Sequence, residues 1–200
     1  MKKFEYTPPE QPRELILKLG QKITDRIGHT VTAEDPEYYG LEALVTDEMA
    51  EVALKMKVRK PMTLAQAVKA TGKEEKVLEE LLQEMSNIGL LEYNWENPKH
   101  EKQYVLPMYV PGSAEFFNMK LDQIKEHPEV ASFFERMAFL PLQKVTPMVP
   151  PGGAGIGMHV IPVEKAIETE NESVSVEHIS HWLDKYDGKY AAGPCSCRYS

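Results

Sequence analysis

The chain has 200 residues, of which 42% are hydrophobic and 27% are charged, and these proportions are ordinary for a globular protein. Its net charge of −8 argues against a nucleic-acid-binding protein, because such proteins contact phosphate through a surplus of lysine and arginine. No apolar run approaches the roughly 18 residues of a membrane span, and no signal-peptide pattern follows Met1, so we expect a cytoplasmic protein with no membrane partner.

The N-terminal region is expected to hold an extended arm and two helices. Several prolines lie within residues 1–12, which favours an extended arm. From Arg13 to Ile27 the apolar residues recur at steps of three and four, which predicts an amphipathic helix with Ile27 on its buried stripe. The same spacing predicts one continuous second helix from Pro36 to about Lys57.

Two segments, 63–66 and 71–74, each fit the capping box. In this motif a hydroxyl and a Glu or Gln three residues later bind each other's free backbone N–H groups. They predict a short helix over 64–70 and a longer one over 73–87, which presents Val77 among its inward residues. Gly89 is placed to end the longer helix in the left-handed conformation.

Two strands are predicted after these helices, over 90–95 and 102–106, with a turn between them. The order of helix, helix, turn, helix and two-stranded wing resembles winged-helix domains over about residues 41–106. The whole chain is therefore expected to be α+β and mostly α, with a winged-helix-like domain and additional C-terminal helices and short strands.

In a DNA-binding winged helix, the helix over 73–87 would read the major groove. This helix carries two lysines against five glutamates, and the wing adds only Lys99, His100 and Lys102. Phosphate neutralisation supplies most of the affinity of such proteins, so an acidic helix would be repelled. The charge pattern argues against nucleic acid as a partner and favours an adapter or intramolecular packing module.

Residues 113–140 predict two apolar helices, the first capped by Ser113 and the second running over 129–140. They would cover the winged helix, dock elsewhere in the protein or form a homodimer. Residues 141–163 are rich in proline and glycine and indicate a linker that ends in a short strand. The glycines at 152–157 do not form a nucleotide loop, because Met158 stands where a dinucleotide fingerprint needs glycine.

A last helix is predicted from Ser175 to Tyr186. His178 and His181 lie one turn apart on it and could bind a metal, but an exposed helix face is the preferred interpretation. The only two cysteines of the chain, Cys195 and Cys197, follow at Cys-x-Cys spacing. Two thiolates are half a metal site, since a [4Fe–4S] cluster or a structural zinc takes about four ligands.

The segments His159-Val160-Ile161-Pro162-Val163 and Cys195-Ser196-Cys197-Arg198 are similar to those of a family of anaerobic iron–sulfur proteins. Its members share an N-terminal winged helix, an Ile-Pro-Val strand and a Cys-x-Cys-Arg motif. More cysteines follow in that family, then ferredoxin-like [4Fe–4S] motifs, and in some members a disulfide-oxidoreductase-like region that binds FAD and NAD(P). The resemblance implies that Cys195 and Cys197 are cluster ligands and that Arg198 donates to sulfide or thiolate.

The resemblance implies the N-terminal, non-catalytic region of an iron–sulfur, flavin-linked oxidoreductase active in electron transfer, cut within its first metal motif. Its partners would be downstream domains of the same protein or a redox protein. No catalytic set is visible in these residues. The alternative is a winged-helix transcriptional regulator, or a protein-interaction module, in which the two cysteines sense redox state or metal.

The expected organisation has five parts. These are an N-terminal arm and helix in 1–37, a winged-helix-like domain in 38–111, an apolar helical segment in 112–140, a linker in 141–163 and the start of an iron–sulfur domain in 164–200.

Overall fold

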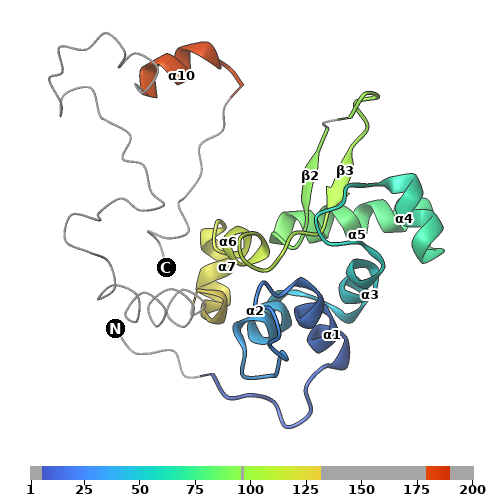
Figure 1. Cartoon of the computed structure of the whole chain (residues 1–200), viewed down its shortest axis with the longest axis vertical. Helices are drawn as coiled ribbons and strands as arrows, with labels where there is room; N and C mark the ends of the chain where they lie inside the picture. Colours follow the sequence, from blue (N-terminus) through green and yellow to red (C-terminus); the bar gives the residue numbers. More distant parts are fainter. Residues whose placement is uncertain (1–5, 96, 132–178, 190–200) are drawn as a thin grey trace, which may run out of the picture. The chain divides into compact units, whose positions relative to one another are not determined.

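The computed structural model describes residues 6–95, 97–131 and 179–189 (Figure 1). The chain divides into two compact units, one of residues 1–140 with 194–200 and the other of residues 141–193. The described residues are mostly helical, with a small antiparallel sheet, which confirms the expected α+β, mostly α class. None of the described helices is both long and apolar enough to cross a membrane.

The first three helices, α1 (Glu14–Ile23), α2 (Pro36–Leu44) and α3 (Asp47–Lys55), pack together in the first unit. The single helix predicted over 36–57 is wrong, because Val45 and Thr46 take extended backbone angles and separate α2 from α3. The Thr46 hydroxyl accepts a hydrogen bond from the Met49 N–H at 3.2 Å and so begins a new helix.

Helix α1 also ends earlier than its apolar pattern predicts. Thr24 is extended, and its hydroxyl donates to the buried Glu37 carboxylate at 2.6 Å. Ile27, expected on the buried stripe, is fully exposed. A tertiary hydrogen bond thus ends the helix before the hydrophobic spacing does.

Strand β1 (Met62–Thr63), helix α4 (Leu64–Thr71) and helix α5 (Glu75–Ile88) follow in order. The capping box predicted at 63–66 is confirmed, with Thr63 and Gln66 each accepting from the other's backbone N–H. The second box is wrong: Thr71 lies inside α4, and the Glu74 carboxylate itself caps α5.

The two strands predicted over 90–95 and 102–106 are confirmed as an antiparallel hairpin of β2 (Glu92–Asn94) and β3 (Gln103–Val105), and below the word wing is a label for this hairpin only. The sequence pattern did not predict that β1 would join it, because a two-residue strand has no readable alternation. Tyr104 at the centre of β3 pairs with Met62 on one side and Tyr93 on the other. The sheet order is β1-β3-β2, so β2 is an edge strand.

After the wing, the chain forms α6 (Ser113–Phe117), α7 (Leu121–Glu126) and a 3₁₀ turn, η1 (Pro128–Val130). One helix was expected over α6 and α7, but the buried Asn118 separates them and donates to the carbonyls of Ala114 and Val130, both at 2.8 Å.

Ser113 does not cap α6 as predicted. It is the first residue of the helix, and the Glu115 carboxylate accepts from the Gly112 N–H at 2.7 Å. Residues 132–140 of the next predicted helix lie outside the described residues.

One hydrophobic core runs from α1 to η1. Helix α5 contributes Leu78, Leu82 and Met85, as predicted, whereas Val77 is 53% exposed, contrary to expectation. Tyr109 is buried and its hydroxyl donates to the Pro36 carbonyl at 2.7 Å, which ties the segment after the wing to the start of α2.

The described part of the second unit is the short helix α10 (Ile179–Lys185) and the turn after it. Its presence agrees with the predicted C-terminal helix. The inward stripe is wrong for Leu183 and Tyr186, because these side chains are exposed. The strand predicted over 158–163 and the glycines at 152–157 lie outside the described residues.

Candidate functional site

The residues predicted to bind a cofactor, Cys195, Cys197 and Arg198, lie outside the described residues, and so does His178. His181 is described and is exposed on α10. Its ring lies edge-on to that of Trp182, with 5.4 Å between the ring centres. Among the described residues no group of three or more His, Cys, Asp or Glu side chains could hold a metal ion. The candidate sites of the described residues are therefore the α4–α5 pair, the wing and a groove beside it.

The α4–α5 pair is positioned by local sequence. Gly72 has a φ of +74°, a left-handed conformation that glycine adopts at little cost, and it turns the chain from α4 into α5. The Glu74 carboxylate accepts from two backbone N–H groups, at 3.1 and 2.9 Å, and so defines where α5 begins. The capping box at Thr63 and Gln66 begins the pair, and Gly89, with a φ of +93°, ends it.

The solvent face of α5 is acidic. The exposed charged residues of Glu74–Ile88 are Glu74, Glu75, Lys76, Glu79, Glu80 and Glu84. The nearby Lys73 is paired with Glu48 of α3 at 2.6 Å. Five carboxylates thus face solvent beside a single ammonium group, and the negative potential of the helix is stronger than the sequence count predicts.

The wing does not compensate for this charge. The Lys102 ammonium donates to Gln83 of α5 at 2.5 Å and lies 4.6 Å from the centre of the Tyr93 ring, so it binds the wing to α5. Lys99 and His100 are exposed at the turn, next to the exposed Glu101. The wing therefore offers two basic side chains beside one acidic side chain.

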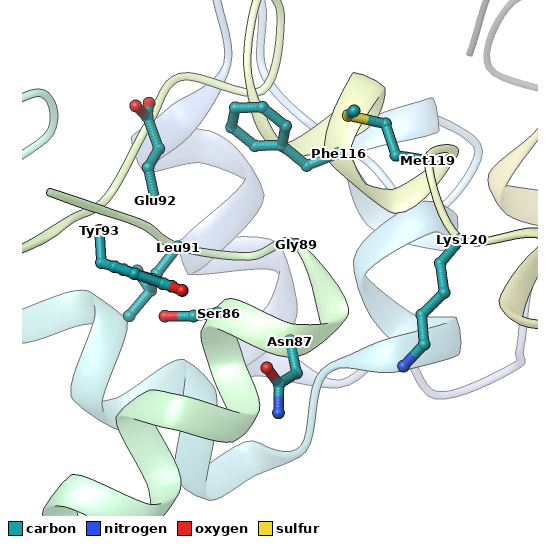
Figure 2. Close-up of a pocket in the computed structure, with 9 residues that line it drawn as sticks. All are labelled: Ser86, Asn87, Gly89, Leu91, Glu92, Tyr93, Phe116, Met119 and Lys120. Atoms are coloured by element: carbon teal, nitrogen blue, oxygen red, sulfur yellow. The ribbon is translucent and has the colours of Figure 1, made fainter. Parts of the chain in front are cut away.

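A groove of about 380 Å³ lies between the end of α5, strand β2 and helix α6 (Figure 2). Its lining residues are Ser86, Asn87, Gly89, Leu91, Glu92, Tyr93, Phe116, Met119 and Lys120. Helix α6 rests directly on Gly89, where an added Cβ would come within 2.8 Å of Phe116. The sequence predicted Gly89 only as a helix end, and nothing in the pattern predicted that another helix would pack on it.

A buried ionic cluster at the junction of α1 and α2 was also missed by the sequence reasoning. Glu37 is fully buried, and the Arg26 guanidinium donates to both its carboxylate oxygens, at 2.8 and 2.5 Å. Arg26 also donates to Asp35 at 2.9 Å, and His29 lies 3.0 Å from the same carboxylate oxygen. The only available signal was the density of charged residues around Pro36.

Hydrogen bonds control the ionisation of this cluster. Burial acts to raise the pKa of Asp35, but the backbone and hydroxyl of Thr32, together with Arg26 and His29, lower that pKa to about 2. The carboxylate is therefore ionised at neutral pH. Arg26 donates to both Asp35 and Glu37, so the cluster holds the end of α1 against the start of α2.

Comparison with protein-family models, with curated proteins and with solved structures found no match to this chain.

Proposed function

We propose that the first unit is a winged-helix-like module that docks protein, and that the chain is the N-terminal, non-catalytic region of an iron–sulfur, flavin-linked oxidoreductase of the cytoplasm. Cys195, Cys197 and Arg198 would begin its [4Fe–4S] site. FAD and NAD(P) would bind downstream, as the family resemblance implies.

The winged-helix part of the proposal is supported by the order of the elements. Helix α3 is followed by β1, the α4–α5 pair and the β2–β3 hairpin, and the three strands form one antiparallel sheet. Helix α3 contacts both α4 and α5. A winged helix has this succession of three helices and a sheet that includes a strand between its first two helices.

The observation that carries the docking role is the charge of α5. The helix that would enter the major groove exposes five carboxylates and one lysine, and Lys102 of the wing is bound to α5. DNA carries about one negative charge per 1.7 Å of its axis, so this face repels it. An acidic face at neutral pH instead attracts basic protein surfaces.

The iron–sulfur part is supported by the chemistry of the donor set. Thiolates are the usual ligands of [4Fe–4S] clusters, and two of about four ligands stand one residue apart at Cys195 and Cys197. The resemblance places the remaining cysteines downstream. Arg198 would offset part of the cluster's negative charge by donating to its sulfur atoms.

The cluster assignment is tested by expressing the chain with the sequence encoded after Ser200 and purifying it without oxygen. We expect Cys195→Ser and Cys197→Ser each to lower the content of iron and acid-labile sulfide by about one cluster per chain. Ser196→Ala, between the two ligands, is the matched control and should keep its iron. Unchanged iron in both cysteine variants, or a reading frame that stops at Ser200, would refute the assignment.

The regulator alternative is tested by a gel shift with mixed genomic DNA at low salt. We expect no retardation of the DNA by the wild-type chain. The variant with Glu79→Lys and Glu80→Lys, which cancels the net negative charge of the α5 face, should retard DNA weakly and lose this binding as salt rises. Tight, salt-sensitive binding by the wild-type chain would favour a regulator over a docking module.

A further inference from the structure

Strand β2 forms one edge of the sheet that the structure describes. Strand β2 pairs with β3 on one side only, and among the described residues no strand pairs with its other side. An edge strand presents backbone N–H and C=O groups that can pair with another chain. The groove between β2 and α6 runs beside this edge (Figure 2).

Exposed apolar side chains accompany the open edge. Tyr93 of β2 is 48% exposed and Met119, just after α6, is 44% exposed. Phe116 is partly exposed between them, on the α6 side of the groove (Figure 2). Aromatic and methionine side chains are enriched where proteins bind one another.

We propose that this groove binds an extended segment of a basic partner protein, which adds to β2 as a further strand. The inference rests on the proposed docking role of the first unit and is independent of the iron–sulfur assignment. Main-chain hydrogen bonds to β2 would provide general affinity, and the side chains of the groove would select the sequence.

The residues of β2 define the chemistry of the segment. Side chains directly opposite each other on paired strands interact, so the position opposite Glu92 should be lysine or arginine. The position opposite Tyr93 should hold an apolar residue that is β-branched or aromatic. The position opposite Leu91 should hold a second apolar residue. The segment would thus alternate between apolar and basic or polar residues.

The net charge of the chain favours a basic segment over a second copy of this chain as the occupant of the groove. Each copy carries a net charge of −8, so two copies repel at long range, whereas a basic segment is attracted. Glu92 and Lys120 lie on opposite sides of the groove (Figure 2). The segment would therefore place a basic residue beside Glu92 and could place an acidic residue beside Lys120. A groove of about 380 Å³ also suits a few side chains of one strand.

The test uses the full chain and a fluorescein-labelled peptide with the core Thr-Val-Lys-Val, written to pair antiparallel with β2. We expect saturable binding in fluorescence anisotropy. Replacing the peptide lysine by glutamate should weaken binding about fivefold, as expected for an exposed ion pair. Glu92→Lys should reverse the preference between the two peptides.

Backbone pairing is tested with two N-methylated peptides, methylated at alternate residues. In a strand, alternate N–H groups point to opposite edges, so one peptide should lose binding and the other should keep it. Loss or retention of binding by both peptides would rule out strand addition.

The groove itself is tested by Met119→Glu, which should weaken peptide binding about tenfold by removing an apolar contact. Val77→Glu is the matched control, because Val77 is an apolar residue of similar exposure that does not line the groove. It should bind as the wild type does. Circular dichroism should show that both variants are folded.

Three further outcomes would overturn the proposal. They are no saturable binding up to about 1 mM peptide, equal weakening by both variants, and self-association of the chain in sedimentation that Met119→Glu abolishes. The last outcome would assign the groove to a second copy. None of these results would change the iron content of the cysteine variants, so the docking inference and the cluster assignment fail separately.

Discussion

The first unit has two groups of charged side chains, one buried and paired and the other exposed to solvent. At the junction of α1 and α2, Glu37 is fully buried and both its oxygens accept from Arg26. Along α5 the carboxylates face solvent and outnumber the single exposed lysine. Buried charges must be paired, so the first group is part of the framework. The second group costs the fold little and is available to a partner.

The largest effect should come from removing the cation of the buried cluster. Arg26→Met leaves Glu37 buried without its ion-pair partner, and we expect a loss of about 3 kcal/mol in the free energy of unfolding, measured with urea. Glu79→Gln on α5 is the control and should change this quantity by less than about 0.5 kcal/mol. Similar losses in the two variants would remove the distinction between framework and surface.

A neutral buried hydrogen bond should matter less than the ion pair. Tyr109→Phe leaves the Pro36 carbonyl without the donor that lies at 2.7 Å, and we expect a loss of about 1–2 kcal/mol. Tyr93→Phe, at an exposed ring, should be almost neutral. A loss above 3 kcal/mol for Tyr109→Phe would mean that this contact rivals the ionic cluster.

The cluster should also make stability depend on pH. Because the pKa of Asp35 in the folded chain is lowered from 3.8 to about 2, its charge stabilises the fold above about pH 4. This contribution, about 1–2 kcal/mol, is lost as the pH falls from 4 to 2. In Asp35→Asn the free energy of unfolding, measured with urea, should depend less on pH between 4 and 2 than in the wild type. In Asp122→Asn, at an exposed site, it should depend on pH as in the wild type.

The smallest effect should come from the acidic face. Replacing Glu79 and Glu80 by glutamine should alter the free energy of unfolding by no more than about 0.5 kcal/mol, because both side chains are exposed. The same variant should bind a lysine-rich peptide more weakly, measured by anisotropy at low salt. A large loss of stability would place these carboxylates in the framework instead.

Local interactions explain which parts of the fold were predictable. The box at Thr63 and Gln66 and the left-handed Gly89 depend on residues within one turn, and both are confirmed. The break at Thr46 was missed because apolar spacing continues across it and hides the cap. Val77 follows the spacing of the stripe yet lies at its edge, so periodicity alone placed it wrongly.

The candidate sites also differ in how much of each could be predicted from the sequence. The acidic character of α5 was readable from composition, but the pairing of Lys102 with Gln83 required knowing that the wing folds against α5. The groove required α6 to rest on Gly89, a contact between segments far apart in the chain. The cluster motif at Cys195 and Cys197 stays a prediction from sequence.

The amino-acid sequence by itself determined the helical class, the caps at Thr63 and Gly89 and the negative charge of α5, since each depends on neighbouring residues or on composition. The tertiary structure alone decided that Asp35 and Glu37 meet at Arg26, that β1 completes the sheet, and that β2 is an edge strand. These features depend on how the elements pack around the core, which neither spacing nor composition shows.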